Sequence, residues 1–440
     1  MRWLAVASIT LALAACHNAS PSPNPSPSPS PSPSPSPGAA DLDLGSLGGT
    51  QHATPAPAPA QQPASPPPPA AAPASAGFDF IEDARLLDRI AACRGDEPVA
   101  EPLQKTVDRH CKSLRERIAK FRAEYWDKHR AWFSDVVPQD IPTTVVYPFG
   151  GGDLLSALVA FPNATDITTI SLELAGDPRR LRTLSAEQLG VSLAALRIEI
   201  GGLLSVGSNT SVNLSAGQRN ELPGQVSSFL IGLVTAGFEP VSMRYFTLDD
   251  TGAIHYLDRS EIDTLDSRRT RALKGDWQSP NFSEAFANVE IQYRKPGETD
   301  PGAIRTHRHI GWNLGDPYLA AHPQLIAYLA SRGKVTILTK GGSYLLQRSD
   351  FSRIRGYMLE HLAWMLSDST GPAPTYARPA GMVQETYGSY AGAFLAGGQG
   401  NRHDESFIEL WRKNPRKRMG FRFGYVDSAG AGHVVVTRPK

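Results

Sequence analysis

The spacing of apolar positions divides the chain near residue 141. Between residues 78 and 140, apolar side chains recur at intervals of three and four, which is typical of helices with one buried face. Gly95, Pro98 and Pro102 interrupt this pattern, and such residues commonly end helices. The segment 78–140 is therefore predicted to be a helical hairpin.

From residue 141 onward, short β-branched and aromatic runs alternate with helical patterns. Residues 143–149 predict a strand, a glycine-rich turn and a helix follow up to Pro162, and residues 167–174 predict a second strand. Strand, helix and strand in this order form a βαβ unit, which belongs to a parallel sheet.

The later elements add antiparallel pairing. The turn at 249–252 predicts a hairpin of the strands 241–248 and 253–257. The other expected elements are helices at 226–237, 323–330 and 351–366, strands at 289–294, 305–312 and 334–339, and a closing hairpin of 421–426 with 434–437. We therefore predict that residues 141–440 form an α/β domain with a Rossmann-like mixed sheet, parallel at its start and antiparallel in its late hairpins.

The first residues have the pattern of a secretory signal peptide. Arg2 precedes an apolar run that ends at Ala15, and this run is shorter than the roughly 20 residues needed to span a bilayer. The sequence Leu13-Ala14-Ala15-Cys16 resembles a bacterial lipobox, in which the cysteine becomes the lipidated first residue of the mature protein. The resemblance implies a signal peptide at 1–15 and a membrane anchor at Cys16. The alternative is an ordinary cleaved signal with a cysteine at this position by chance.

Residues 16–77 are dominated by Pro, Ser and Ala. Such a segment buries too little apolar surface to fold, so we expect a disordered spacer between the anchor and the folded domain. His17 stands where an Asp often marks retention in the inner membrane in lipoproteins of this type. The leader therefore predicts a protein of the bacterial cell envelope, in the outer rather than the inner membrane.

The charge and the cysteine content narrow the classes of protein that fit this sequence. With 44 Lys and Arg against 43 Asp and Glu, the net charge is +1, so no nucleic acid partner is expected. Disulfides persist in exported proteins, and Cys93 and Cys111 are the only cysteines besides Cys16. A redox or metal pair is the alternative, but Cys-x-x-Cys and neighbouring metal ligands are absent. We therefore predict a disulfide between Cys93 and Cys111 that links the two helices.

The turn Gly150-Gly151-Gly152-Asp153 directly follows the first strand, and Glu173 stands 21 residues after Gly152. In dinucleotide-binding domains, such glycines allow close approach of the backbone, and an acidic residue about 20 positions on contacts the ribose. The strict Gly-x-Gly-x-x-Gly spacing is absent, and Asp153 would repel a phosphate. We therefore expect no cofactor here and favour a neutral polar or mixed-charge ligand. The alternative is a turn that only packs the helix, with Asp153 as its N-cap.

Further motifs lie between residues 143 and 395. They are Tyr147-Pro148-Phe149-Gly150-Gly151-Gly152-Asp153, Lys340-Gly341-Gly342-Ser343-Tyr344-Leu345, Phe351-Ser352-Arg353-Ile354-Arg355, Asp368-Ser369 with Gly371, and Tyr387-Gly388-Ser389-Tyr390. In these motifs the chain resembles a group of uncharacterised bacterial lipoprotein or envelope proteins, which implies no particular activity. The opening also resembles the first βαβ unit of methyltransferase-like Rossmann folds, a likeness of fold alone.

Ligands of open α/β sheets bind beyond the carboxyl ends of the strands. Lys340 and Ser343 follow the strand 334–339, and Glu173 ends the strand 167–174. If these strands neighbour the first one, a single ligand-binding crevice is lined by Gly150, Gly151, Gly152, Asp153, Glu173, Lys340 and Ser343. The alternative is that Lys340 pairs structurally with Asp368.

No residue has the setting of a catalytic group, since Gly-x-Ser-x-Gly and His-Glu-x-x-His are absent. His307 and His309 share one face of a predicted strand without a third ligand, so a polar strand face is favoured over a metal site. The sequence therefore favours a lipid-anchored protein that binds a small ligand or an envelope partner without catalysis. The alternative is a transferase or hydrolase that acts at the glycine-rich turn.

Overall fold

The computed structural model describes residues 77–204, 222, 224–268, 283–390, 402–414, 417–424 and 432–440. All of them belong to one unit, which spans Ala70–Lys440. The predicted signal peptide, Cys16 and the spacer up to residue 76 lie outside the described residues.

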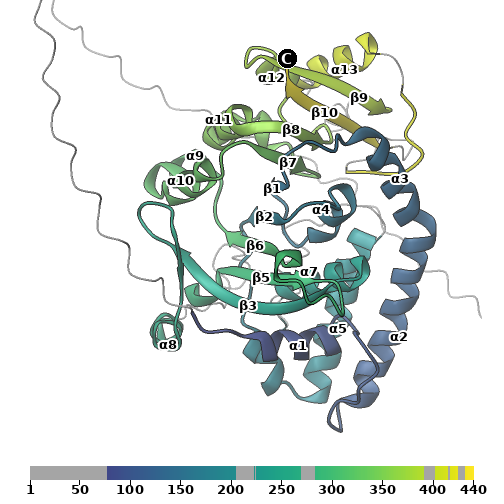
Figure 1. Cartoon of the computed structure of the whole chain (residues 1–440), viewed down its shortest axis with the longest axis vertical. Helices are drawn as coiled ribbons and strands as arrows, with labels where there is room; N and C mark the ends of the chain where they lie inside the picture. Colours follow the sequence, from purple (N-terminus) through teal and green to yellow (C-terminus); the bar gives the residue numbers. More distant parts are fainter. Residues whose placement is uncertain are drawn as a thin grey trace, which may run out of the picture. The chain divides into compact units, whose positions relative to one another are not determined.

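The described residues form a mixed sheet of ten strands in the order β4-β3-β5-β6-β2-β1-β7-β8-β10-β9 (Figure 1). The strands are β1 (Thr144–Pro148), β2 (Asp166–Ser171), β3 (Glu239–Leu248), β4 (Ile254–Tyr256), β5 (Asn288–Arg294), β6 (Arg305–Gly311), β7 (Val335–Thr339), β8 (Leu362–Ser367), β9 (Met382–Gly388) and β10 (His433–Pro439). The central strands β6, β2, β1, β7 and β8 run parallel to one another. Antiparallel pairs flank them on both sides. The prediction of a mixed α/β sheet is confirmed.

Helices cover both faces of this sheet (Figure 1). One face carries α1 (Ile81–Ile90), α2 (Gln104–Phe121), α3 (Asp127–Val136), α4 (Leu154–Ala160), α5 (Ala186–Leu204) and α7 (Gly224–Ala236), and the other carries α9 (Asp316–Ala321), α10 (Gln324–Ser331) and α11 (Ser352–His361). The remaining helices are α8 (Arg259–Ser267), α12 (Pro374–Ala377) and α13 (Arg402–Lys413). Within the described ranges, no helix is both long and apolar enough to cross a membrane.

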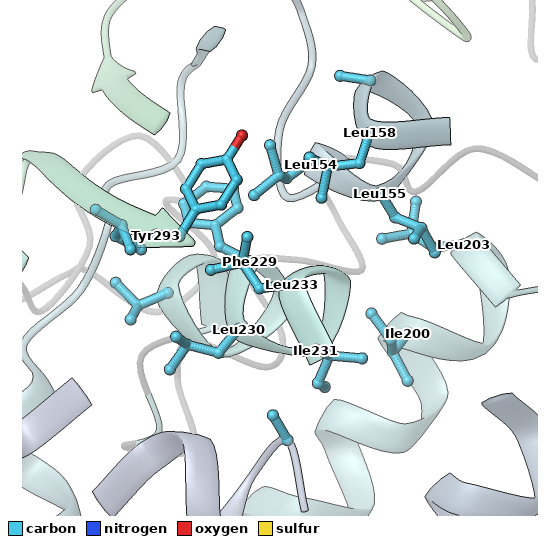
Figure 2. Close-up of a cluster of buried hydrophobic side chains, with 14 of the residues drawn as sticks. Leu154, Leu155, Leu158, Ile200, Leu203, Phe229, Leu230, Ile231, Leu233 and Tyr293 are labelled. Carbon is cyan, nitrogen blue, oxygen red and sulfur yellow. The ribbon is translucent and has the colours of Figure 1, made fainter. Parts of the chain in front are cut away.

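The side-chain alternation along β1 explains why helices are needed on both faces. Val145 and Tyr147 enter one hydrophobic core with α4 and α7, whereas Val146 enters a second core with α10 and α11. In the first core α7 is buried on nearly all sides, including its polar residues Gln225, Ser227 and Ser228, so it is enclosed by its neighbours. Figure 2 shows this enclosure, in which Phe229, Leu230, Ile231 and Leu233 of α7 lie among Leu154, Leu155 and Leu158 of α4, Ile200 and Leu203 of α5, and Tyr293 of β5.

Two late elements differ from their prediction. The helix predicted at 351–366 ends at His361, and residues 362–367 form β8 instead. Residues 362–366 are uniformly apolar, a pattern that fits a buried parallel strand as well as a helix, and their burial between β7 and β10 decides in favour of the strand. The closing hairpin is also wrong, because β10 pairs with β8 and β9, and residues 421–424 form no strand. Residues 425 and 426 lie outside the described ranges.

The predicted disulfide joins the end of α1 to α2. Cys93 and Cys111 are bonded, with their Cα atoms 5.3 Å apart, so this prediction is confirmed. Both cysteines are buried in the same hydrophobic core as Leu87, Leu114 and the first face of the sheet. The helices α1 and α2 therefore share their core with the sheet.

Replacing Cys93 and Cys111 together by alanine should destabilise the protein. The bond closes a loop with a sequence separation of 18 residues, for which the chain-entropy model gives about 3 kcal/mol. Urea unfolding of the variant and its parent should show this loss in the free energy of unfolding. Non-reducing peptide mapping of the parent should yield one peptide pair joined through these cysteines, and free thiols on both would contradict the structure.

Candidate functional site

The carboxyl ends of β1, β2, β6 and β7 meet around one cavity. The strand order reverses at β1, because the chain passes from β1 to β2 on one side and later adds β7 and β8 on the other. The helix α4 joins β1 to β2 on one face, and α11 joins β7 to β8 on the opposite face. Such a reversal leaves a crevice between the two connections. Here it holds a cavity of about 100 Å³, whose walls include Gly151, Glu173, Ser343 and the aromatic rings of Phe149, Trp312 and Phe351.

Three residues of the cavity walls carry buried polar atoms without hydrogen-bond partners. Ser171, Glu173 and Trp312 all contribute to its walls. In the part of the chain that the structure describes, Ser171 Oγ, Glu173 Oε1 and Trp312 Nε1 are buried and have no hydrogen-bond partner. A buried polar group left in this state costs roughly 1–3 kcal/mol. The residues that form the walls thus carry a hydroxyl, a carboxylate oxygen and an indole N–H whose hydrogen bonds are unsatisfied among the described residues.

The backbone around the cavity is held in rare conformations. Phe149, Ser343 and Tyr344 have φ values of 61°, 49° and 58°, which lie in the left-handed region that non-glycine residues seldom adopt. Phe149 and Ser343 line the cavity, and Tyr344 is the next residue. Such strain costs on the order of 1–3 kcal/mol per residue and clusters at ligand sites. This strain therefore supports the same location as the unpartnered polar atoms.

Asp153 and Lys340 form a buried ion pair that does not belong to the cavity walls. Lys340 Nζ donates to Asp153 Oδ2 at 2.9 Å and to Ser156 Oγ at 2.9 Å. The Tyr147 hydroxyl also donates to Asp153 Oδ2, at 3.0 Å, and burial together with the charge of Asp153 raises the pKa of Tyr147 well above its ordinary value. Asp153 in addition caps α4, since its Oδ1 accepts from the backbone N–H of Ser156. These contacts give both residues a structural role.

Asp368 binds the backbone of the turn after β7 instead of pairing with Lys340. One of its carboxylate oxygens accepts from the backbone N–H of Gly341 at 2.9 Å, and the Thr370 hydroxyl accepts from the N–H of Gly342 at 3.0 Å. The backbone N–H of Gly150 is likewise used, by the carbonyls of Tyr147 and Ile170. These glycines therefore supply room beside the cavity rather than free donors.

The predicted crevice residues fall into two groups. Gly151, Glu173 and Ser343 line the cavity. Gly150, Gly152, Asp153 and Lys340 do not, because their contacts face the core: a Cβ at Gly150 would meet Tyr147, and one at Gly152 would meet Ser228. Glu173 also stands two residues beyond β2, which ends at Ser171, instead of ending the strand as predicted.

The sequence reasoning did not select Ser171 and Trp312. Ser171 is the last residue of β2, and Trp312 directly follows β6. The rule that drew attention to Lys340, its position at the carboxyl end of a strand, applied equally to both. What was missing was the position of β6 beside β2, which brings Trp312 to the same edge.

Two pairs of nucleophile and base lie near this region. Ser156 Oγ contacts Lys340 Nζ, and Ser369 Oγ is 2.8 Å from His433 Nε2. Asp153 neutralises the lysine of the first pair, and the space beside Ser156 is only about 10 Å³, room for roughly one water. Ser369 and His433 are fully buried and line none of the cavities described above. Among the described residues, neither pair therefore belongs to the walls of the cavity at the carboxyl ends of the strands.

His307 and His309 lie side by side on β6 and are both buried. One ring nitrogen of each is 3.0 Å from Thr169 Oγ1, and both rings contact Phe229 of α7. Burial lowers the pKa of His309 to about 4, so its ring is neutral at pH 7. The described residues contain no group of three or more His, Cys, Asp or Glu side chains arranged to hold a metal ion.

Comparison with known proteins yields no match: no family model, no curated protein and no solved structure is significantly similar to this chain. The resemblance of its motifs to bacterial envelope lipoproteins therefore stays a prediction.

Replacing Lys340 by methionine should strongly destabilise the fold, because it leaves the Asp153 carboxylate buried without a counter-charge. Breaking a buried ion pair in this way costs roughly 3–5 kcal/mol. The double change Lys340→Met with Asp153→Asn should recover part of this loss, because no buried charge remains. Urea unfolding measures both effects. Lys413→Met, which breaks an exposed pair with Glu409, serves as control and should change stability little. An unchanged free energy of unfolding in Lys340→Met would contradict the role given to the pair.

Proposed function

We propose that this protein is a lipid-anchored envelope protein whose Rossmann-like domain binds a small ligand, without catalysis, in the cavity at the carboxyl ends of β1, β2, β6 and β7. The observation that carries the proposal is the presence of Ser171 Oγ, Glu173 Oε1 and Trp312 Nε1, all buried and unpartnered, around a single cavity. The strained backbone at Phe149 and Ser343 supports it.

A Rossmann-like arrangement is supported by the central parallel strands. The order β6-β2-β1-β7-β8 reverses at β1, and the connections α4 and α11 lie on opposite faces. The ligand position in such sheets is set by this reversal, and the cavity lies there. The antiparallel strands on both sides extend the sheet beyond that pattern.

The wall chemistry indicates a ligand that donates hydrogen bonds. Among the described residues, Glu173 is the only charged one in the walls, so it favours an ammonium or hydroxyl group and repels a carboxylate or phosphate. The aromatic rings of Phe149, Trp312 and Phe351 line the same cavity. Such rings attract a cation or pack against an apolar ligand face. The Trp312 N–H and the Ser171 hydroxyl then serve an acceptor on the same ligand.

The volume limits what enters. A dry cavity of about 150 Å³ holds benzene, so the present cavity of about 100 Å³ accommodates a head group of few atoms. A larger ligand would leave its remainder outside.

The alternative is a transferase or hydrolase acting at the glycine-rich turn. Such an enzyme requires a nucleophile or base at the ligand. The Ser369–His433 contact of 2.8 Å is the observation in its favour. Against it, the described cavity walls contain neither residue, so the binding function is preferred.

Glu173→Gln should abolish the preference of the cavity for cationic ligands. Saturation-transfer NMR with ethanolamine, glycerol and acetate separates an ammonium, a hydroxyl and an anion of similar size. The parent should bind ethanolamine or glycerol and not acetate. Glu173→Gln should weaken the binding of ethanolamine by about tenfold or more, which is the loss expected when a hydrogen bond to a charged group is removed. Trp312→Phe keeps a ring but removes the N–H, and should weaken glycerol severalfold.

Exposed Glu360 on α11 provides the matched control, and Glu360→Gln should bind as the parent does. The melting temperature of Glu173→Gln should not fall, because the change replaces a buried carboxylate, one oxygen of which has no partner, by an uncharged amide of the same shape. Equal binding of acetate and ethanolamine, or unaltered ethanolamine binding in Glu173→Gln, would refute the proposed ligand chemistry.

The proposed anchor predicts that Cys16→Ser releases the protein from the membrane. Lipid attachment requires the thiol of the lipobox cysteine, and no described helix could replace it as a membrane span. Fractionation of cell envelopes should find the parent in the outer-membrane fraction and the variant in the soluble one. If the variant stays with the membranes, the anchor is wrong, whereas the ligand-binding proposal is unaffected.

A further inference from the structure

A second cavity lies beside the amino end of β1, away from the cavity at the carboxyl ends of the strands. It is formed by the second half of α3, the segment 137–143 that leads into β1, and the end of α4 with residues 161–164. Its volume is about 250 Å³. The first cavity lies beyond the other end of β1, so the two are separate sites.

The walls of this second cavity are mostly apolar. They include Phe133, Val137, Ile141, Val145, Val159 and Phe161. The uncharged polar residues Ser134, Gln139, Thr143 and Asn163 also line it, and among the described residues Arg130 is the only charged one in the walls. An apolar space with a single cation at its wall is suited to an amphiphile with one anionic group.

Arg130 has no counter-charge in the part of the chain that the structure describes. It is half-buried, and no ion pair, hydrogen bond or ring contact of its guanidinium with a described residue is found. Burial and the positive charge of Arg305 lower the pKa of Arg130. Arg305 reaches the rim of the cavity, since it donates to the carbonyl of Pro162 at 2.6 Å. Two guanidinium groups thus act on the same region.

The end of α4 adds only a small opposing charge. A helix carries roughly half a negative charge at its carboxyl end, and α4 ends at Ala160 in the cavity wall. Half a charge does not neutralise two guanidinium groups, and no carboxylate of a described residue lines the cavity.

We propose that this cavity binds an anionic amphiphile, a carboxylate on a short apolar chain, with Arg130 pairing to the carboxylate. The guanidinium fork matches the two oxygens of a carboxylate. In proportion to the ~150 Å³ cavity that holds benzene, the volume accommodates roughly ten non-hydrogen atoms, about the size of octanoate. The apolar walls take the chain, and the charge requirement is opposite to that of the cavity at Glu173.

Calorimetric titration of the folded protein with octanoate, octan-1-ol and acetate tests this site. Octanoate should bind, octan-1-ol should bind about ten- to hundredfold more weakly because it lacks the charged hydrogen bonds, and acetate should not bind measurably because it lacks the chain. Arg130→Gln should weaken octanoate to the level of octan-1-ol, and Arg130→Lys should retain an intermediate affinity. Glu173→Gln should leave octanoate binding unchanged.

Arg353→Gln is the matched control, since Arg353 is exposed on α11 at the opposite face of the sheet. Circular dichroism should show that the Arg130 variants fold. If Arg130→Gln does not fold, the affinity of Arg130→Lys for octanoate and the comparison of octanoate with octan-1-ol decide the role of Arg130. Equal affinities of octanoate and octan-1-ol, full octanoate binding in Arg130→Gln, or no octanoate binding to the parent would each overturn the proposal.

Discussion

The buried ion pair between Lys340 and Asp153 connects the two halves of the parallel sheet at the point where the strand order reverses. Burying two charges is expensive, and their attraction compensates only when further hydrogen bonds satisfy them. Ser156 Oγ and the Tyr147 hydroxyl supply these bonds. Because Asp153 also caps α4, a single carboxylate fixes the end of β7, the end of β1 and the start of the first crossover helix.

The cavity at this edge follows from that attachment. On the other side of the turn after β7, Asp368 holds the backbone of Gly341, and Thr370 holds Gly342. With both turns fixed, Phe149 and Ser343 are kept in left-handed conformations that each side chain alone would disfavour. The resulting space is small, aromatic and bordered by buried polar atoms without partners. The stability lost at these positions is the reason for placing the proposed ligand site here.

Local patterns predicted the parts of this structure that depend on neighbouring residues. The βαβ unit at 143–174 follows from strand and helix periodicity, and the Asp153 cap follows from the chemistry of helix N-termini. The Cys93–Cys111 disulfide follows because the two cysteines flank one helical break. Where several elements fit one pattern, the sequence was insufficient: the apolar run 362–366 suits a strand or a helix equally, and only its place between β7 and β10 decides.

The candidate site could be predicted from the sequence only in part, for the same reason. Position at a strand end identified Gly151, Glu173 and Ser343, and all three line the cavity. The same rule also selected Lys340, whose side chain turns to the opposite side of its turn because Asp153 lies there. Trp312 escaped notice because the neighbour of β2 is β6, a strand more than 130 residues later in the chain. Side-chain direction and strand order are properties of the assembled sheet, so spacing along the chain contains neither.

The direction of Lys340 also affects the charge of the residues that line the cavity. A lysine facing the cavity would pair with Glu173 and neutralise the only charge in its walls. Because Asp153 binds the ammonium group instead, at 2.9 Å, the carboxylate of Glu173 stays without a cationic partner in those walls. The charge of the cavity walls therefore depends on an ion pair that lies outside them. The sequence led us to expect that Asp153 repels a phosphate directly. In the structure its carboxylate instead pairs with Lys340, and neither residue belongs to the walls of the cavity.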